Sequence, residues 1–219
     1  MNSTAPIASS HWRDDRGAPS LTGSPAIWIA LTTCGTAAYA LGARGVFHSD
    51  PGALPIAVLI AALGPSAAFL AVYAISARLR RWVAALDLAE LIALQAWRIL
   101  GFAFLIAWAL AALPAVFALP AGLGDIAVGL AAPAAALAVA RRSPGWRRGA
   151  YTVTIAGLID FAVAFATGIL SREGGILAFT GATPSTLLGN VPLSLFPTFI
   201  VPAFLILHIM TLIKLRQDR

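Results

Sequence analysis

Four ionisable residues lie inside long apolar stretches of the chain: Arg98, Asp125, Asp160 and His208. A charge at the centre of a bilayer costs about 2.5–3.5 kcal/mol on insertion scales, so such groups are rare and are usually paired. A guanidinium and a carboxylate on different helices form such a pair, and a neighbouring imidazole can exchange a proton near neutral pH. We therefore predict an ion pair between Arg98 and Asp160, with His208 beside it.

Asp125, Gln95 and Glu90 complete the predicted ligand-binding or proton-relay site. At 100° per residue, Asp87, Glu90, Gln95 and Arg98 fall on one side of a helix, which predicts a polar stripe that faces the bundle. Two alternatives stay open. Asp125 near a helix start also suits an N-terminal cap, and Asp87 and Glu90 also suit hydration at the membrane interface.

The elements that must position these residues are six apolar stretches, each long enough to cross a hydrocarbon core of about 30 Å. Hydrophobic residues make up 59% of the chain and charged residues 11%. The mean hydropathy is +0.85. This composition excludes a water-soluble domain, and continuous apolar runs predict helices rather than barrel strands. The expected fold is an all-α integral membrane bundle with spans near residues 26–47, 53–76, 88–112, 121–140, 150–171 and 192–213.

The basic residues gather on alternate sides of these spans. Twelve lie in the two termini and the even-numbered loops, and two lie in the remaining loops. The positive-inside rule therefore predicts that both termini are cytoplasmic. Anionic lipid headgroups are the expected partners of the arginine clusters, because each basic residue near the surface gains about 1 kcal/mol.

Two segments stand apart from the six spans. Residues 1–25 are polar and lack apolar periodicity, which predicts a disordered cytoplasmic tail before a transmembrane domain over residues 26–215. Residues 172–191 form a long extracytoplasmic loop, either a polar crossover with a short interfacial helix or a lid or re-entrant segment over a cavity. Pro197 and Pro202 predict a bend in the outer half of the last helix.

The fourth and fifth spans share a sequence pattern. Residues 121–131 read AGLGDIAVGLA and residues 156–166 read AGLIDFAVAFA, with seven of eleven positions identical. Because the two helices run in opposite directions, the pair would form an inverted repeat, which transporters use to build a central site. Small apolar residues match by chance in such a chain, so Asp125 and Asp160 carry most of the information.

The sequence does not contain the residues that several common cofactor, metal and catalytic sites require. A bis-histidine haem needs two buried histidines, and no metal-binding cluster of Cys and His occurs. No P-loop, nucleophile elbow or HExxH motif is present. The basic residues flank spans instead of following one exposed face, which argues against nucleic acid. We expect no cofactor, no metal and no nucleic-acid partner.

Four stretches resemble parts of a functionally uncharacterised family of small bacterial inner-membrane proteins with six helices. They are QAWRILGFAFLIAWA, LPAVFALPAGLGDIAVGLAAP, GLIDFAVA and PTFIVPAFLILH, within roughly residues 90–215. The resemblance implies a multi-pass protein of the bacterial inner membrane. It implies no activity, substrate or catalytic residue.

Three functions fit these features. The leading hypothesis is a small transport or permeation protein with its site near Arg98, Asp160 and His208. The second is an intramembrane protein that binds a lipid or quinone, or an enzyme acting on one with Asp160 and His208 as acid and base. The third is a structural or accessory subunit, in which buried charges only hold helices together. Assembly into a homo-oligomer stays open.

Overall fold

A computed structural model describes residues 19–50, 52–179 and 183–217 of the chain. Within these residues, six helical segments are long and apolar enough to cross a membrane, which confirms the predicted all-α, six-span fold. Their bounds differ from prediction by at most four residues in the first, second and fifth spans. The elements in chain order are α1 (Pro25–Ala43), α2 (Ile56–Ile75), α3 (Ala77–Ala85), α4 (Leu88–Ala93), η2 (Leu94–Gly101), α5 (Phe102–Ala109), α6 (Ala115–Ala140), α7 (Trp146–Leu170), η3 (Ser185–Gly189), η4 (Phe196–Ile200) and α8 (Val201–Gln217).

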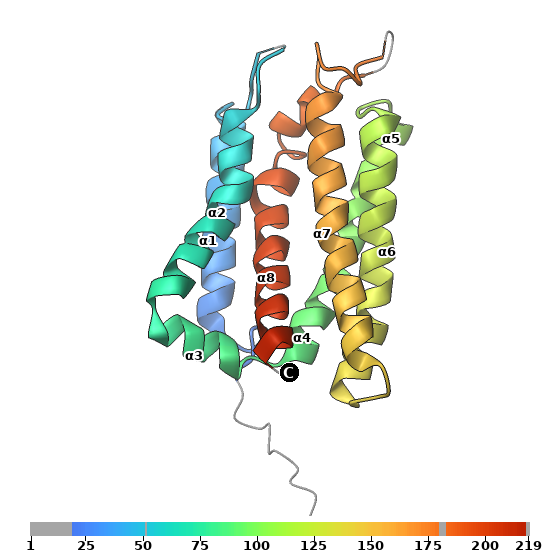
Figure 1. Ribbon diagram of the computed structural model, residues 1–219. Helices are drawn as coiled ribbons and strands as arrows, with labels where there is room; N and C mark the ends of the chain where they lie inside the picture. The colour runs from blue at the N-terminus through green and yellow to red at the C-terminus, as the bar shows by residue number, and fades with distance from the viewer. Residues whose placement is uncertain (1–18, 51, 180–182, 218–219) are drawn as a thin grey trace, which may run out of the picture.

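The spans form one bundle in which α6 packs against α4, η2, α5 and α7, while α8 packs against α2, α4 and α7. Figure 1 shows α8 between α2 and α7. The C-terminal end of α8, the helix α3 and the α6–α7 loop lie together at one end, which we name the terminal end. The described residues of the α1–α2 loop, the α5–α6 loop and residues 171–179 and 183–195 lie at the opposite end, which we name the loop end.

A short helix crosses the terminal end where the sequence predicted only a loop. The helix α3 carries Arg78, Arg80 and Arg81, and it lies across the ends of the spans (Figure 1). Its first turn is capped by the Ser76 hydroxyl, which accepts from the Leu79 N–H at 3.2 Å. Val83 is fully buried, while the three arginines are exposed, so α3 has the two faces of a helix that lies at a membrane interface.

The third span is not one continuous α-helix. A 3-10 segment, η2, separates α4 from α5, and the span ends at Ala109 rather than at residue 112. Because a 3-10 helix has three residues per turn, Gln95, Arg98 and Gly101 fall on one face, and all three are buried. The predicted polar stripe therefore holds for Gln95 and Arg98 only. Asp87 is exposed and caps α4, its Oδ1 accepting from the Ala89 N–H at 2.9 Å.

The fourth span begins earlier than the predicted residue 121. The helix α6 begins at Ala115, although Pro120 removes one backbone N–H close to its start. Prolines are tolerated in membrane helices, where neighbouring groups satisfy the freed carbonyl. Asp125 consequently lies nearly three turns inside α6, and Pro114 holds the position before the helix. The interpretation of Asp125 as an N-terminal cap is wrong.

The sixth span begins later than the predicted residue 192. It starts with the π-helical turn η4, continues as α8 and extends past residue 213 to Gln217. The turn contains Pro197, where we predicted a bend. The Ser194 carbonyl, just before this turn, accepts from the Thr198 N–H at 3.1 Å and from the Thr198 hydroxyl at 2.7 Å.

Candidate functional site

Arg98 is the centre of a buried polar cluster that joins four elements. Its Nη2 atom contacts Asp125 Oδ1 of α6 at 2.8 Å and donates to Asp160 Oδ2 of α7. Its Nη1 atom donates to the Gly157 carbonyl at 3.3 Å and lies 3.1 Å from His208 Nε2 of α8. The predicted pair of Arg98 with Asp160 is present, and the two acids of the shared sequence pattern meet at the same nitrogen.

The helices approach closely at this cluster because glycines leave room for its side chains. A Cβ atom added to Gly157 would lie 2.5 Å from His208 Cε1 and 3.2 Å from Arg98 Nη1. A Cβ atom on Gly124 would overlap the Asp160 carboxylate. These glycines therefore set the distance at which α6, α7 and α8 hold the polar groups.

The Phe161 ring covers the guanidinium. Arg98 Cζ lies 3.8 Å from the centroid of this ring, a distance typical of a cation–π contact. The same ring meets His208 edge to face, with 5.7 Å between ring centroids. His208 is fully buried. Because guanidinium N–H groups only donate, His208 Nε2 accepts, and the neutral ring carries its proton on Nδ1.

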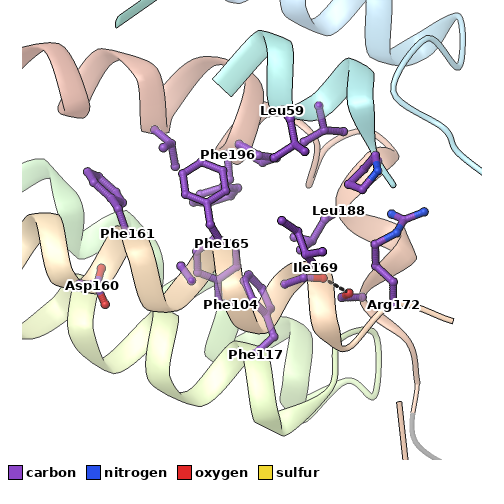
Figure 2. Close-up of a pocket in the computed structure, with 18 of the residues that line it drawn as sticks. Leu59, Phe104, Phe117, Asp160, Phe161, Phe165, Ile169, Arg172, Leu188 and Phe196 are labelled. Atoms are coloured by element: carbon purple, nitrogen blue, oxygen red, sulfur yellow. Dashed lines mark hydrogen bonds between the residues drawn. The ribbon is translucent and has the colours of Figure 1, made fainter. Parts of the chain in front are cut away.

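A cavity of about 80 Å³ extends from the polar cluster toward the loop end. Its lining is mostly apolar, and Figure 2 shows the rings of Phe161, Phe165 and Phe196 along it. The lining residues are Pro55 just before α2, Val58 and Leu59 of α2, and Phe104, Phe117, Asp125, Asp160, Phe161, Ala164, Phe165, Gly168, Ile169, Arg172, Ser185, Leu188, Gly189, Phe196, Pro197 and Val201.

The acids and the arginine are exposed to this cavity very differently. Asp125 and Asp160 line it, and 14% and 10% of their side-chain surfaces are exposed. None of the Arg98 side-chain surface is exposed. The carboxylates therefore form the inner end of the cavity, and the guanidinium holds them from behind.

The long loop after α7 lines the opposite end of the cavity. Arg172, Ser185 and Leu188 belong to it and line the cavity. The Arg172 Nη2 atom donates to the Ser49 hydroxyl at 2.6 Å, and the Ser185 hydroxyl donates to the Gly168 carbonyl at 2.6 Å. Burial lowers the pKa of the Arg172 guanidinium from its ordinary value. The described part of the loop thus lines the cavity and also contains the short helix η3, so both alternatives for this loop stay open.

The structure separates the remaining two predicted site residues. Gln95 is buried one 3-10 turn before Arg98, and neither polar atom of its amide has a hydrogen-bond partner among the described residues. Glu90 lies elsewhere: it accepts from the Ser20 hydroxyl at 2.7 Å and from the Thr22 N–H at 2.9 Å. Glu90 therefore holds the segment before α1. Residues 1–18 of the predicted tail lie outside the described part of the chain.

Sequence reasoning missed the aromatic lining and Arg172. Phe161 and Phe165 are four residues apart, so the two rings fall on one face of α7, beginning one residue after Asp160. That spacing is a usable signal, but phenylalanine is common in membrane spans and the spacing alone does not separate a cavity wall from a packed core.

The cluster contains two carboxylates and one guanidinium, so it has one more acidic group than basic group when all three are ionised. A buried excess charge is costly unless a proton or a bound cation neutralises it. The cavity gives such a partner access to the carboxylates. The chemistry available here is therefore uptake and release of a proton or of a positively charged group.

Comparison with known proteins identifies a family. No curated protein and no solved structure matches the chain. A family model matches residues 55–216, a range that begins just before α2 and includes every residue of the polar cluster and the cavity. The helix α1 lies outside this range. The chain belongs to the family described as a domain of unknown function, DUF8737.

Proposed function

We propose that the protein is a small membrane transport or permeation protein in which Asp125 and Asp160 take up and release protons as a solute passes. One observation carries this function: two carboxylates from antiparallel helices share the Arg98 guanidinium at the closed end of a cavity. Intramembrane acids that are reachable from one side are the usual elements of proton-coupled pathways.

Buried polar residues continue from the cluster toward the terminal end, beyond the inner end of the cavity. His208, Thr211 and Lys214 recur every third residue along α8, and all three are buried. Lys214 Nζ donates to the Ala84 carbonyl at the terminal end, at 2.7 Å. The polar cluster thus lies between a cavity on one side and a line of polar groups on the other. This position favours passage through the bundle over binding from one side only.

The elements on both sides of the site have irregular helical geometry, which suits a site that must open. Arg98 lies on η2, a 3-10 segment of eight residues, whereas runs longer than three or four residues are uncommon. Phe196 and Pro197 of the π-helical turn η4 line the cavity. Irregular turns within spans often mark functional hinges, so we infer that movement of η2 and η4 changes access to the two acids.

Proton flux tests this function. Purified protein is placed in liposomes that contain a pH-sensitive dye, and a proton gradient is applied with valinomycin and potassium present to balance charge. We expect faster internal acidification than in protein-free liposomes. Asp125→Asn and Asp160→Asn should each bring the rate close to the protein-free value, because each change removes one proton-binding carboxylate while keeping its shape.

Asp87→Asn is the matched control, since Asp87 is an exposed acid outside the cavity and asparagine also caps helices well. Its flux should equal that of the wild type. Flux that is the same in both cavity variants and the wild type would contradict the assignment of the two acids. Flux no faster than in protein-free liposomes would contradict proton permeation through the two acids.

Lipid or quinone binding is a second candidate, favoured by the apolar wall of the cavity. Leu59, Phe165 and Ile169 line the cavity and are half-buried, so they also reach the lipid-facing surface of the spans. An apolar chain in the membrane would find matching surface there. Mass spectrometry of the purified protein should then detect one lipid or quinone enriched over the bulk membrane, and a bulk-like composition would argue against this candidate.

We further propose that the terminal end faces the cytoplasm of a bacterial inner membrane and contacts anionic lipids. The loop of Arg141 and Arg142 and the exposed arginines of α3 lie at this end. Basic loops are retained on the cytoplasmic side, and anionic headgroups attract them.

A further inference from the structure

The carboxylates of Asp125 and Asp160 face the cavity, whereas the Arg98 guanidinium is not exposed to it. This arrangement favours a positively charged ligand. We propose that the cavity binds a hydrophobic ammonium compound, with the ammonium group at the carboxylates of Asp125 and Asp160 and an unbranched apolar chain along the phenylalanine wall. This inference rests on the proposed function, because it names the solute class for the same site.

The charges around the cavity favour a cation at its inner end. Asp125 and Asp160 are exposed to the cavity, and the only charged or titratable groups beside them in the described residues are Arg98 and His208. His208 is neutral when its Nε2 accepts from Arg98. One guanidinium then balances one of two carboxylates. An ammonium group would balance the other and would donate up to three hydrogen bonds.

An anionic ligand would find no available cation at this end. Arg98 Nη2 already contacts both carboxylates, and Nη1 contacts the Gly157 carbonyl and His208 Nε2. Only its Nε atom has no partner among the described residues, and the side chain is not exposed. A carboxylate or phosphate in the cavity would therefore meet two like charges first.

Arg172 at the opposite end fixes the direction of the ligand. Asp160 lies ten residues before the end of α7 at Leu170, about 15 Å at 1.5 Å per residue, and Arg172 follows two residues later in the loop. An ammonium group is repelled by Arg172 and attracted by the acids. The cationic head therefore lies inward, and the apolar chain points toward the loop end.

The walls of the cavity fit a cation with a narrow apolar chain. Phe104, Phe165 and Phe196 belong to the lining, and aromatic faces attract cations. The volume is about 80 Å³, smaller than the engineered apolar cavity of about 150 Å³ that binds benzene. The ammonium group and the first carbons of an unbranched chain occupy this space, and the rest of the chain follows the apolar wall toward the loop end.

Binding and proton exchange follow from the same charge balance. When the ammonium compound is absent, a proton can neutralise the excess carboxylate. When the ammonium group binds, that proton becomes unnecessary and is released to solution. One positive charge enters as one leaves, and no covalent bond is formed or broken apart from the bond to the exchanged proton.

Three probes with the same chain test this solute class: n-octylammonium, n-octanol and n-octanoate. The wild-type protein is held in nanodiscs of phosphatidylcholine, and empty nanodiscs measure partition into the lipid. We expect octylammonium to raise the unfolding temperature and to release protons into weakly buffered solution at pH 7. Octanol should bind at least tenfold more weakly without proton release, and octanoate should not bind above the empty nanodiscs.

Two variants locate the head group. Asp125→Asn and Asp160→Asn should each weaken octylammonium binding at least tenfold and leave octanol binding unchanged, while Asp87→Asn should match the wild type for all three probes. The comparison of the three probes on the wild-type protein needs no variant. It therefore tests the ammonium assignment even if an asparagine variant fails to fold. Equal affinity for octylammonium and octanol, or tighter binding of octanoate, would overturn the ammonium assignment.

The same measurements separate this inference from the proposed function. Proton flux in liposomes without selective binding of octylammonium would reject the ammonium class and keep proton-coupled transport. Selective binding with proton release, but no proton flux even with octylammonium present, would keep the ammonium site and reject transport.

Discussion

Asp125 and Asp160 lie on neighbouring antiparallel helices and both reach the same nitrogen atom, Nη2 of Arg98. The two segments that contain them have matching sequences, so the chain places an equivalent acid on each side of one guanidinium. A carboxylate beside the guanidinium accounts for the burial of an arginine within a span. Because one acid already balances Arg98, the second acid leaves the cluster able to take up a further cation. It also makes the stability of the cluster testable by removing its members one at a time.

Arg98→Met should destabilise the protein by about 3–5 kcal/mol, because it leaves two buried carboxylates without a cation. Adding Asp125→Asn and Asp160→Asn to Arg98→Met should recover much of this loss, since the excess charge is then removed. Thermal unfolding in detergent measures both steps. Arg81→Met is the control, because Arg81 is exposed on α3, and it should have an effect within about 0.5 kcal/mol. Equal unfolding temperatures for Arg98→Met and the triple variant would contradict an electrostatic cause.

Gly157→Ala should destabilise the protein by about 1–3 kcal/mol, because the new methyl group would lie 2.5 Å from His208 Cε1. Gly149→Ala is a matched control on the same helix, where a Cβ atom meets nothing within 4 Å. It should be neutral or stabilise by up to about 1 kcal/mol, since alanine favours the helix over glycine. We would measure the unfolding temperatures of both single variants and of the double variant Gly157→Ala/His208→Ala. The double variant shows whether the contact with His208 causes the loss of stability. If the added His208→Ala fails to restore stability, the contact with His208 is not the cause.

A contact in the site was predictable from sequence where its absence would carry a large free-energy penalty. The pair of Arg98 with Asp160 follows from sequence, because an unpaired charge in a span is too costly to persist. Asp125 was placed in the wrong part of its helix, because α6 begins at Ala115, six residues before the predicted start, and continues through Pro120. The 3-10 geometry around Arg98 was not predictable, since it depends on packing of η2 against α6 and not on residue composition.

Two other parts of the molecule show why contacts distant in sequence escape prediction. Glu90 fits a polar stripe when only its own helix is considered, but its partners Ser20 and Thr22 are about seventy residues away. The cavity wall combines side chains from α2, α7 and η4, whose apolar residues look alike in sequence. Length, hydropathy and charge placement predict the six spans, while the site depends on how those spans meet.

Glu90→Ala should release the segment before α1 without affecting the polar cluster. Glu90 accepts four hydrogen bonds from Ser20, Leu21 and Thr22, between 2.7 and 3.0 Å. Without the carboxylate, amide hydrogen exchange of residues 20–24 should become faster. Proton flux in liposomes should equal that of the wild type. A loss of flux with unchanged exchange would instead return Glu90 to the proton pathway that its sequence position suggested.

Cysteine labelling should place the terminal end in the cytoplasm and the loop end outside. The natural Cys34 is first replaced by Ser, and single cysteines are then introduced as Ser143→Cys in the α6–α7 loop and Glu173→Cys in the loop after α7. A membrane-impermeant maleimide added to intact cells should label Glu173→Cys, because this loop carries few basic residues and is exported. Ser143→Cys lies among Arg141, Arg142 and Arg147 and should react only after the membrane is permeabilised. The Cys34→Ser protein without a new cysteine measures background labelling. Labelling of Ser143→Cys in intact cells, with Glu173→Cys protected, would reverse the orientation and place the cavity end, with Arg172, on the cytoplasmic side.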